Sequence, residues 1–329
     1  MKPRRISVSP RGKAALRLLV SLLLLYALLR RLDWLRLVAL LQQARWGWMI
    51  PAVGLLALGF GLSALRWRAV LRDLGLNEPL SRLLYWNLLA FFWSQFLPTT
   101  VGGDGYRVLR LLRRYPERKA DALTSVFLDR LYGYLALLSV HGALLPWTVS
   151  LWFRQPWLRG VEGILGGGIL VGGGLLAWGR GRGWRRLFLS YRWLRPWLRH
   201  VAAILRKVWQ RSPQTVAWAW GYSAWFVLAN GVMRWCYLRV VGADAPLLPV
   251  LYASTLAAVL GALPVTLNGL GLTETALVVA LTPVGLSPES VLLSAFLLRA
   301  VNLSVGLLGG VLYTVEGARF TAANTTRSR

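Results

Sequence analysis

Apolar stretches long enough to cross a lipid bilayer recur along the whole chain, and they restrict its fold more than any other feature. They occupy residues 14–29, 46–65, 122–146, 162–178, 212–238 and 290–313. Because a helical span needs about 20 mostly apolar residues, the sequence predicts an all-α polytopic membrane protein with about six full transmembrane helices. Residues 33–43 have a helical amphipathic pattern, which predicts a short helix at the membrane interface.

The composition excludes several other classes of protein. The chain carries 39 Lys and Arg against 12 Asp and Glu, a net charge of +27, yet 56% of it is hydrophobic and its mean hydropathy is +0.50. A nucleic-acid binder of this charge would be polar, and a disordered chain would be poor in apolar residues. The single cysteine, Cys236, excludes a disulfide scaffold and Cys-rich zinc sites, and His141 and His200 are too far apart to suggest a metal site. We therefore expect no nucleic-acid partner, no metal and no cofactor.

Basic residues near the ends of spans predict the orientation in the membrane. They gather in the leader, residues 1–13, in residues 107–119, and in residues 179–211, where ten Lys or Arg occur without an acid. All three segments can be cytoplasmic only if residues 83–114 enter and leave on the same side. Both termini are then cytoplasmic, in the inner (plasma) membrane. The basic loop at residues 30–45 would be external and counts against this topology.

Two apolar segments, residues 83–114 and 247–284, are broken by the same motif. The pattern Leu-Pro-x-Thr-apolar-Gly/Asn-Gly-x-Gly begins at Leu97 and again at Leu263, 166 residues later. Proline breaks a helix and glycine allows unusual backbone angles, and irregular backbone at membrane depth is tolerated only against protein or water. Two hairpins entering from opposite faces predict an inverted repeat of re-entrant hairpins. The residues expected to shape the breaks are Pro98, Gly102, Gly103, Pro264, Asn268 and Gly269. The whole predicted domain spans residues 14–315, followed by a tail at residues 316–329.

Ionisable residues inside the apolar segments are the candidates for function, because buried charges in a membrane are costly. A helix beginning after each break would point its free N–H groups at the turn, which favours an anion such as a lipid headgroup. The candidate headgroup site consists of Thr99, Asp104, Arg107, Asp129, Arg130, Thr273, Glu274 and Arg299. We predict no catalytic residue. Arg234 and Arg239 are interpreted as anchors at the end of their span.

The charges allow a functional and a structural interpretation. In the functional one, Arg130 and Arg299 clamp a lipid phosphate, since guanidinium matches phosphate oxygens. Asp104 and Glu274 then supply counter-charge, bind a headgroup amine or carry a coupling proton. In the structural one, Asp129 pairs with Arg299, or Glu274 with Arg130, to hold the bundle together.

Three motifs together resemble one membrane-protein family. They are Phe96 to Arg107, then Ser125-x-x-x-Asp129-Arg130-x-x-Gly133, then Leu263-Pro264 through Glu274. This pattern resembles the lysylphosphatidylglycerol synthase transmembrane-region family, also called the flippase-like family, over roughly residues 15 to 315. Asn268 departs from it, because a small residue such as Ser or Gly is expected there. The resemblance implies an inner-membrane protein that handles an anionic lipid. In other members this region is joined to a lipid synthase or a glycosyltransferase, and we expect a stand-alone member here.

The leading functional hypothesis is translocation of an anionic phospholipid or a polyprenyl-phosphate-linked lipid through a polar cavity between the hairpins. A membrane transferase acting on a lipid phosphate is an alternative, with Asp104, Asp129 and Glu274 as its available acids. The sequence contains no paired-acid metal motif, nucleotide loop or Ser-His set to support it. A third hypothesis is a non-catalytic partner of a separate lipid synthase or glycosyltransferase.

Overall fold

The protein is described by a computed structural model that covers residues 10–30, 32–96, 102–154, 159–163, 165–167, 211–263 and 265–327. Every regular element in these ranges is helical, which confirms the predicted all-α fold. The main helices are α1 (Pro10–Leu29), α2 (Trp34–Gln42), η1 (Trp46–Trp48), α3 (Met49–Asp73), α4 (Leu80–Phe96), α5 (Gly102–Arg114), α6 (Lys119–Arg154), α10 (Pro213–Val240), α11 (Leu247–Gly261), η2 (Leu267–Gly269), α12 (Leu272–Leu281), η3 (Thr282–Val284) and α13 (Pro288–Arg327). Most of the predicted span at 162–178 and of the basic loop at 179–211 lies outside the described residues.

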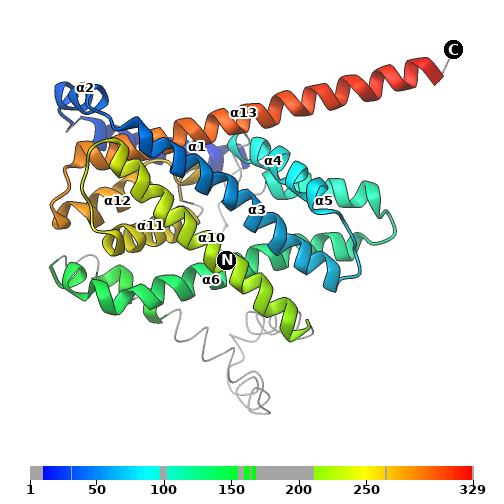
Figure 1. The fold of residues 1–329 in the computed structure, drawn as a ribbon, viewed down its shortest axis with the longest axis horizontal. Helices are drawn as coiled ribbons and strands as arrows, with labels where there is room; N and C mark the ends of the chain where they lie inside the picture. Colours follow the sequence, from blue (N-terminus) through cyan, green and yellow to red (C-terminus); the bar gives the residue numbers. More distant parts are fainter. Residues whose placement is uncertain are drawn as a thin grey trace, which may run out of the picture.

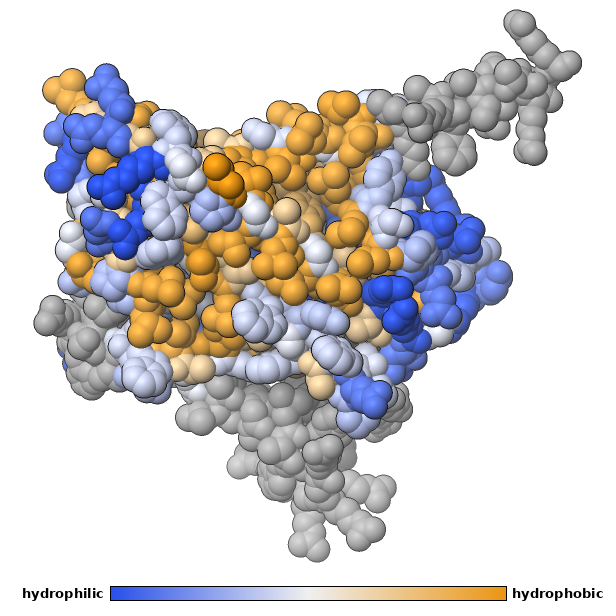
Figure 2. Space-filling model, in the orientation of Figure 1, coloured by the Kyte–Doolittle hydropathy of each residue, from blue (hydrophilic) through white to orange (hydrophobic). Residues whose placement is uncertain are grey.

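The described helices form a membrane-embedded bundle. Four stretches in this part of the chain are long and apolar enough to cross a membrane: Trp46–Asp73, Lys119–Thr148, Leu267–Val284 and Pro288–Thr314. Helix α10 has 28 residues but is not among these four. Figure 2 shows an apolar band between two hydrophilic ends, one beside α2 and the other beside the end of α5. Such a band is the surface expected to contact lipid tails.

Helices α3 and α10 lie side by side through the middle of the bundle (Figure 1). The predicted span ended at Leu65, but α3 continues to Asp73 and carries Arg66 and Trp67 into the interior. Trp67 is fully buried in a core formed with α4, α5 and α6. The boundary prediction was wrong because the basic residues after Leu65 resemble an interfacial anchor, whereas the helix continues, and Arg66 binds Asp129 and Trp67 binds Ser125 inside the protein.

The first hairpin consists of α4 and α5. Its base is closed by the buried carboxylate of Glu78, which pairs with Arg82 at 2.5 Å and with Arg114 at 3.6 Å. Helix α5 begins at Gly102, so the glycines at 102 and 103 belong to the helix. A Cβ on Gly103 would lie 2.4 Å from the carbonyl oxygen of Ala90. Glycine therefore serves close packing of the two arms at this point.

The second hairpin consists of α11, a turn containing η2, and α12. Here the backbone is irregular, as predicted: φ is 49° at Asn268, 72° at Gly269 and 80° at Gly271. Helix α12 has ten residues, about 15 Å at 1.5 Å per residue, which is half the thickness of the hydrocarbon core. The aligned motifs thus form a helix start in one hairpin and a left-handed turn in the other.

Two further helices extend beyond their predicted ends. Helix α6 continues through Pro146 to Arg154, and α13 continues past the predicted span at Tyr313 to Arg327. α13 packs on α4 through glycines, since a Cβ on Gly309 would lie 2.8 Å from the carbonyl oxygen of Leu88. The end of α13 projects away from the bundle (Figure 1).

Candidate functional site

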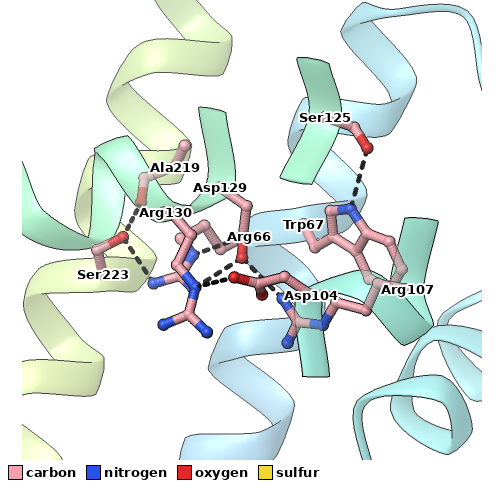
Figure 3. A network of polar contacts seen from close by, with 9 residues as sticks. All are labelled: Arg66, Trp67, Asp104, Arg107, Ser125, Asp129, Arg130, Ala219 and Ser223. Atoms are coloured by element: carbon pink, nitrogen blue, oxygen red, sulfur yellow. Dashed lines mark hydrogen bonds and ion pairs between the residues drawn. The ribbon is translucent and has the colours of Figure 1, made fainter. Parts of the chain in front are cut away.

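The carboxylate of Asp129 is the centre of a buried arginine cluster (Figure 3). Arg66 binds it with two hydrogen bonds, from Nε to Oδ1 at 2.6 Å and from Nη2 to Oδ2 at 3.0 Å. Arg107 donates from Nη1 to Oδ2 at 3.0 Å. Asp129 is 0% exposed, so the two guanidiniums neutralise a charge that burial would otherwise make very costly.

The motif around Asp129 follows one face of α6. Ser125, four residues earlier, lies 3.4 Å from the indole nitrogen of Trp67, which donates to its hydroxyl. Gly133, four residues later, leaves room for Arg66, because a Cβ there would lie 3.1 Å from its Nη1. Residues four apart share a helix face. Ser125, Asp129 and Gly133 therefore lie on one face of α6, where they contact Trp67 and Arg66 of α3. This arrangement positions Arg107 over the Trp67 ring, 5.0 Å from its centroid.

Arg130 and Asp104 form a second pair next to this cluster, at the surface. Nε of Arg130 donates to Oδ2 of Asp104 at 2.7 Å. The side chain of Arg130 is 44% exposed and that of Asp104 is 14% exposed. Only one edge of the guanidinium is used, so its remaining N–H groups are available to an anion.

The second hairpin has its own arginine–acid pair. Nε of Arg299 on α13 donates to Glu274 at 2.6 Å, and its Nη2 donates to the Thr273 hydroxyl at 3.1 Å. The Glu274 carboxylate also accepts from the backbone N–H of Gly271 at 2.8 Å, where α12 begins. Acids are favoured at this end of a helix. Arg299 is 31% exposed, so it too can reach a ligand.

Arg234 on α10 faces this second pair. It is half-buried and within electrostatic range of both Glu274 and Arg299. Within the described residues its guanidinium makes no hydrogen bond or ion pair. The interpretation of Arg234 as a membrane anchor was therefore wrong. Arg239, one turn and a half further along, pairs with Asp244 and lies over Trp235, which fits an anchor.

The two hairpins touch near their breaks. The side-chain amide of Asn268, in the turn of the second hairpin, donates to the carbonyl oxygen of Ser94 on α4 at 3.0 Å. Helix α1 covers the same turn, because the Ser21 hydroxyl accepts from the backbone N–H of Leu267 at 2.9 Å. The departure from the family pattern at Asn268 thus provides a contact between the repeats.

Seven of the eight predicted headgroup residues fall into two groups in the structure. Asp104, Arg107, Asp129 and Arg130 form the first group, and Thr273, Glu274 and Arg299 form the second with Arg234. Thr99, Pro98 and Pro264 lie outside the described residues. The proposed pairings of Asp129 with Arg299 and of Glu274 with Arg130 were wrong, because a nearer arginine meets each acid: Arg66 and Arg107 for Asp129, and Arg299 for Glu274.

Both groups carry more arginine than acid. The first has Arg66, Arg107 and Arg130 against two aspartates, and the second has Arg234 and Arg299 against one glutamate. Two buried atoms that can donate a hydrogen bond have no partner in the described residues and lie close by along the chain, Nε of Arg107 and Oγ1 of Thr266. The surplus of donors and positive charge is suited to a phosphate-bearing ligand.

Comparison with known proteins agrees with the three motifs. The family model described as the lysylphosphatidylglycerol synthase TM region matches residues 14–310. No curated protein matches the chain. Because the matched region includes both hairpins and all the charged residues above, the chain belongs to the lysylphosphatidylglycerol synthase transmembrane-region family.

Proposed function

We propose that the protein translocates an anionic phospholipid or polyprenyl-phosphate-linked lipid across the inner membrane. The observation that carries this proposal is the contact between the hairpins at Asn268 and Ser94, with an arginine-rich group beside each hairpin. Membership of the family supports a lipid as the ligand. The surplus positive charge of both groups supports an anionic one.

The two partly exposed arginines are the proposed headgroup contacts. Arg130 is held to Asp104 through Nε, and Arg299 is held to Glu274 through Nε and to Thr273 through Nη2. These bonds fix each guanidinium while leaving other N–H groups to bind phosphate oxygens. Asp129 has the different role of holding Arg66 and Arg107 in place.

The proposed path follows from the predicted topology. With both termini cytoplasmic, the first hairpin enters from the cytoplasm and the second from outside, so the two arginine groups lie in series across the membrane. A headgroup bound at one would pass the contact at Asn268 to reach the other while its tails stay in the bilayer. Movement of one repeat against the other would alternate access, as in other inverted-repeat transporters.

Translocation in proteoliposomes tests this proposal. The purified protein is reconstituted with a fluorescent anionic phospholipid, and the labelled lipid in each leaflet is measured by a quencher added outside. Arg130→Ala and Glu274→Gln are each expected to slow translocation about tenfold or more, because a charged hydrogen bond contributes about 1.5–3 kcal/mol. Arg239→Ala is the control, since Arg239 pairs with Asp244 at the end of α10.

The result that overturns the site assignment is unaltered translocation in both site variants. Absence of translocation by the native protein overturns the function itself. Chemical analysis of the recovered lipid adds a second readout: unmodified lipid agrees with translocation, and modified lipid supports the transferase instead.

A further inference from the structure

A second buried polar cluster lies apart from both arginine groups. It joins His141 on α6, Glu162 in the helical piece at residues 159–163, and Tyr252 and Thr255 on α11. The His141 and Glu162 side chains are 0% and 2% exposed. The His141 and Tyr252 rings are stacked, with centroids 5.4 Å apart. The proposed headgroup path does not use these residues, although burying them is costly unless every polar atom has a partner.

Hydrogen bonds link the four side chains in a row. The Tyr252 hydroxyl donates to Oε1 of Glu162 at 2.5 Å, and Oε2 of Glu162 lies 3.1 Å from Nε2 of His141. On the other side of the ring, Nδ1 lies 2.8 Å from the Thr255 hydroxyl, which is also 2.8 Å from the carbonyl oxygen of Tyr252. The Thr255 hydroxyl has one proton and two acceptors within reach.

The position of the Thr255 proton defines two complete arrangements. If Thr255 donates to the carbonyl of Tyr252, it accepts from N–H at Nδ1, and a second proton lies between Nε2 and Oε2. If Thr255 donates to Nδ1 instead, His141 keeps a single proton on Nε2, which it donates to the carboxylate. The second arrangement holds one proton fewer, and no hydrogen bond between the side chains is lost. The cluster can therefore release or take up one proton, exchanged with water, by rotation of a single hydroxyl.

The two arrangements differ in net charge. The protonated one is neutral overall, whereas the other leaves one negative charge on a buried site. Helix α11 contains no charged residue, and the Glu162 segment carries one basic residue, Arg159, whose exposed side chain has an interaction of its own. Asp129 and Arg130 on α6 are 12 and 11 residues from His141, about 16–18 Å along the helix. On α10, Arg234 faces Glu274, and Arg239 binds Asp244. Loss of the proton therefore favours separation of these segments and hydration of Glu162.

We infer that the His141–Glu162 pair is a proton-binding site that couples protonation to movement of the second hairpin. This inference rests on the proposed function, in which one hairpin moves against the other. Helix α11 is one arm of the second hairpin and leads directly into the turn that carries Asn268. With the proton bound, α11 is held against α6 and residues 159–163. With the proton released, α11 is free to move, so a proton gradient can bias the position of the hairpin and supply energy for lipid movement.

Hydrogen exchange of the native protein across pH tests the proton site without any transport assay. Protection factors of α11 amides, corrected for the intrinsic pH dependence of exchange, are measured between about pH 5 and about pH 9. Protection is expected to fall as pH rises in the native protein. Glu162→Gln keeps a neutral partner for both Tyr252 and His141, so its α11 should stay protected throughout.

Two further variants sharpen the test. Tyr252→Phe retains the stacked ring but removes a donor to the Glu162 carboxylate, so the pH at which α11 protection falls should differ from that of the native protein. Glu117→Gln changes an exposed acid between α5 and α6 and should leave the profile unchanged. The proton site is overturned if native and Glu162→Gln proteins show the same pH profile.

Coupling to transport has a separate readout. In proteoliposomes with an imposed pH gradient, the native translocation rate should change with the gradient, and the Glu162→Gln rate should not. A gradient-independent native rate overturns the coupling while leaving lipid translocation intact. If the native protein moves no lipid, the coupling fails together with the proposed function, and the exchange profiles still decide whether the proton site exists.

Discussion

Two aspartates that the sequence places in the same candidate site have different surroundings. Asp129 is fully buried and bound by Arg66 and Arg107, whereas Asp104 is partly exposed and holds one edge of Arg130. A buried carboxylate with two guanidiniums is a structural centre, because losing it leaves unpaired charges inside the protein. An exposed guanidinium with free N–H groups is suited to binding a ligand. Exposure therefore separates the residues that build the site from those that contact the headgroup.

Replacing Asp129 is expected to affect stability before function. In Asp129→Asn, Arg66 and Arg107 lose their shared counter-charge, and breaking a buried pair costs about 3–5 kcal/mol. The midpoint of thermal unfolding in detergent should fall clearly. The matched control is Asp244→Asn, whose carboxylate is 65% exposed beside Arg239 and should cost less than about 1 kcal/mol. Equal stability of the two variants contradicts the structural role of Asp129.

Residue types and spacing were enough to select Arg130, Asp104, Glu274 and Arg299, because charges inside apolar segments are visible in a sequence. Arg66 was missed because it follows directly after an apolar stretch, where a basic residue usually marks the membrane surface. His141 was considered only as a metal ligand. Its partners Glu162 and Tyr252 are 21 and 111 residues away, so only the packing of the helices reveals the cluster.

At the scale of elements, the same motif gives two different structures. In the first hairpin the glycines at 102 and 103 lie in helix α5, and in the second Asn268, Gly269 and Gly271 have positive φ. The predicted irregular backbone is confirmed in the second hairpin, whereas the inverted repeat of re-entrant hairpins stays a prediction. Glycine is compatible with both a close helix contact and a left-handed turn, so its identity alone does not distinguish them.

Substitution of two neighbouring glycines tests the close contact of α4 and α5. In Gly103→Ala the added methyl group would meet the Ala90 carbonyl oxygen, whose backbone cannot easily move, so the arms must separate at a cost of about 1–3 kcal/mol. Gly105→Ala, in the same helix, has open space around it and should be neutral or stabilising by up to about 1 kcal/mol. The midpoint of thermal unfolding should therefore fall in Gly103→Ala and should stay unchanged or rise in Gly105→Ala. Equal destabilisation would show that the two arms do not pack as described.

At the scale of the whole molecule, hydrophilic residues gather at the two ends of an apolar bundle (Figure 2). The loop between α3 and α4 and the loop between α5 and α6 lie near one end, and the turns that flank the second hairpin lie towards the other (Figure 1). A hairpin that enters and leaves on one side brings both of its ends to the same face. We interpret the net charge of +27 mainly as a signal that orients the protein in the membrane.

Cysteine labelling from one side of the membrane tests the two hairpins together. In a Cys236→Ser background, single cysteines at Asn77 and Glu117 flank the first hairpin, and those at Gly242 and Gly285 flank the second; all four positions are exposed. An impermeant maleimide added to intact cells should label the second pair and not the first. Labelling of only one member of either pair would mean that the corresponding segment crosses the membrane completely.

The headgroup selectivity of translocation tests most directly whether the arginines bind an anionic lipid. Liposomes containing the native protein are loaded with an anionic and a zwitterionic phospholipid that have the same tails and distinguishable labels. We expect the anionic lipid to cross at least about tenfold faster, and Arg130→Ala combined with Arg299→Ala to remove this preference, because each guanidinium contributes a charge-assisted contact to the phosphate group. Equal rates for the two lipids in the native protein, or an unchanged preference in the double variant, would contradict this role of the arginines.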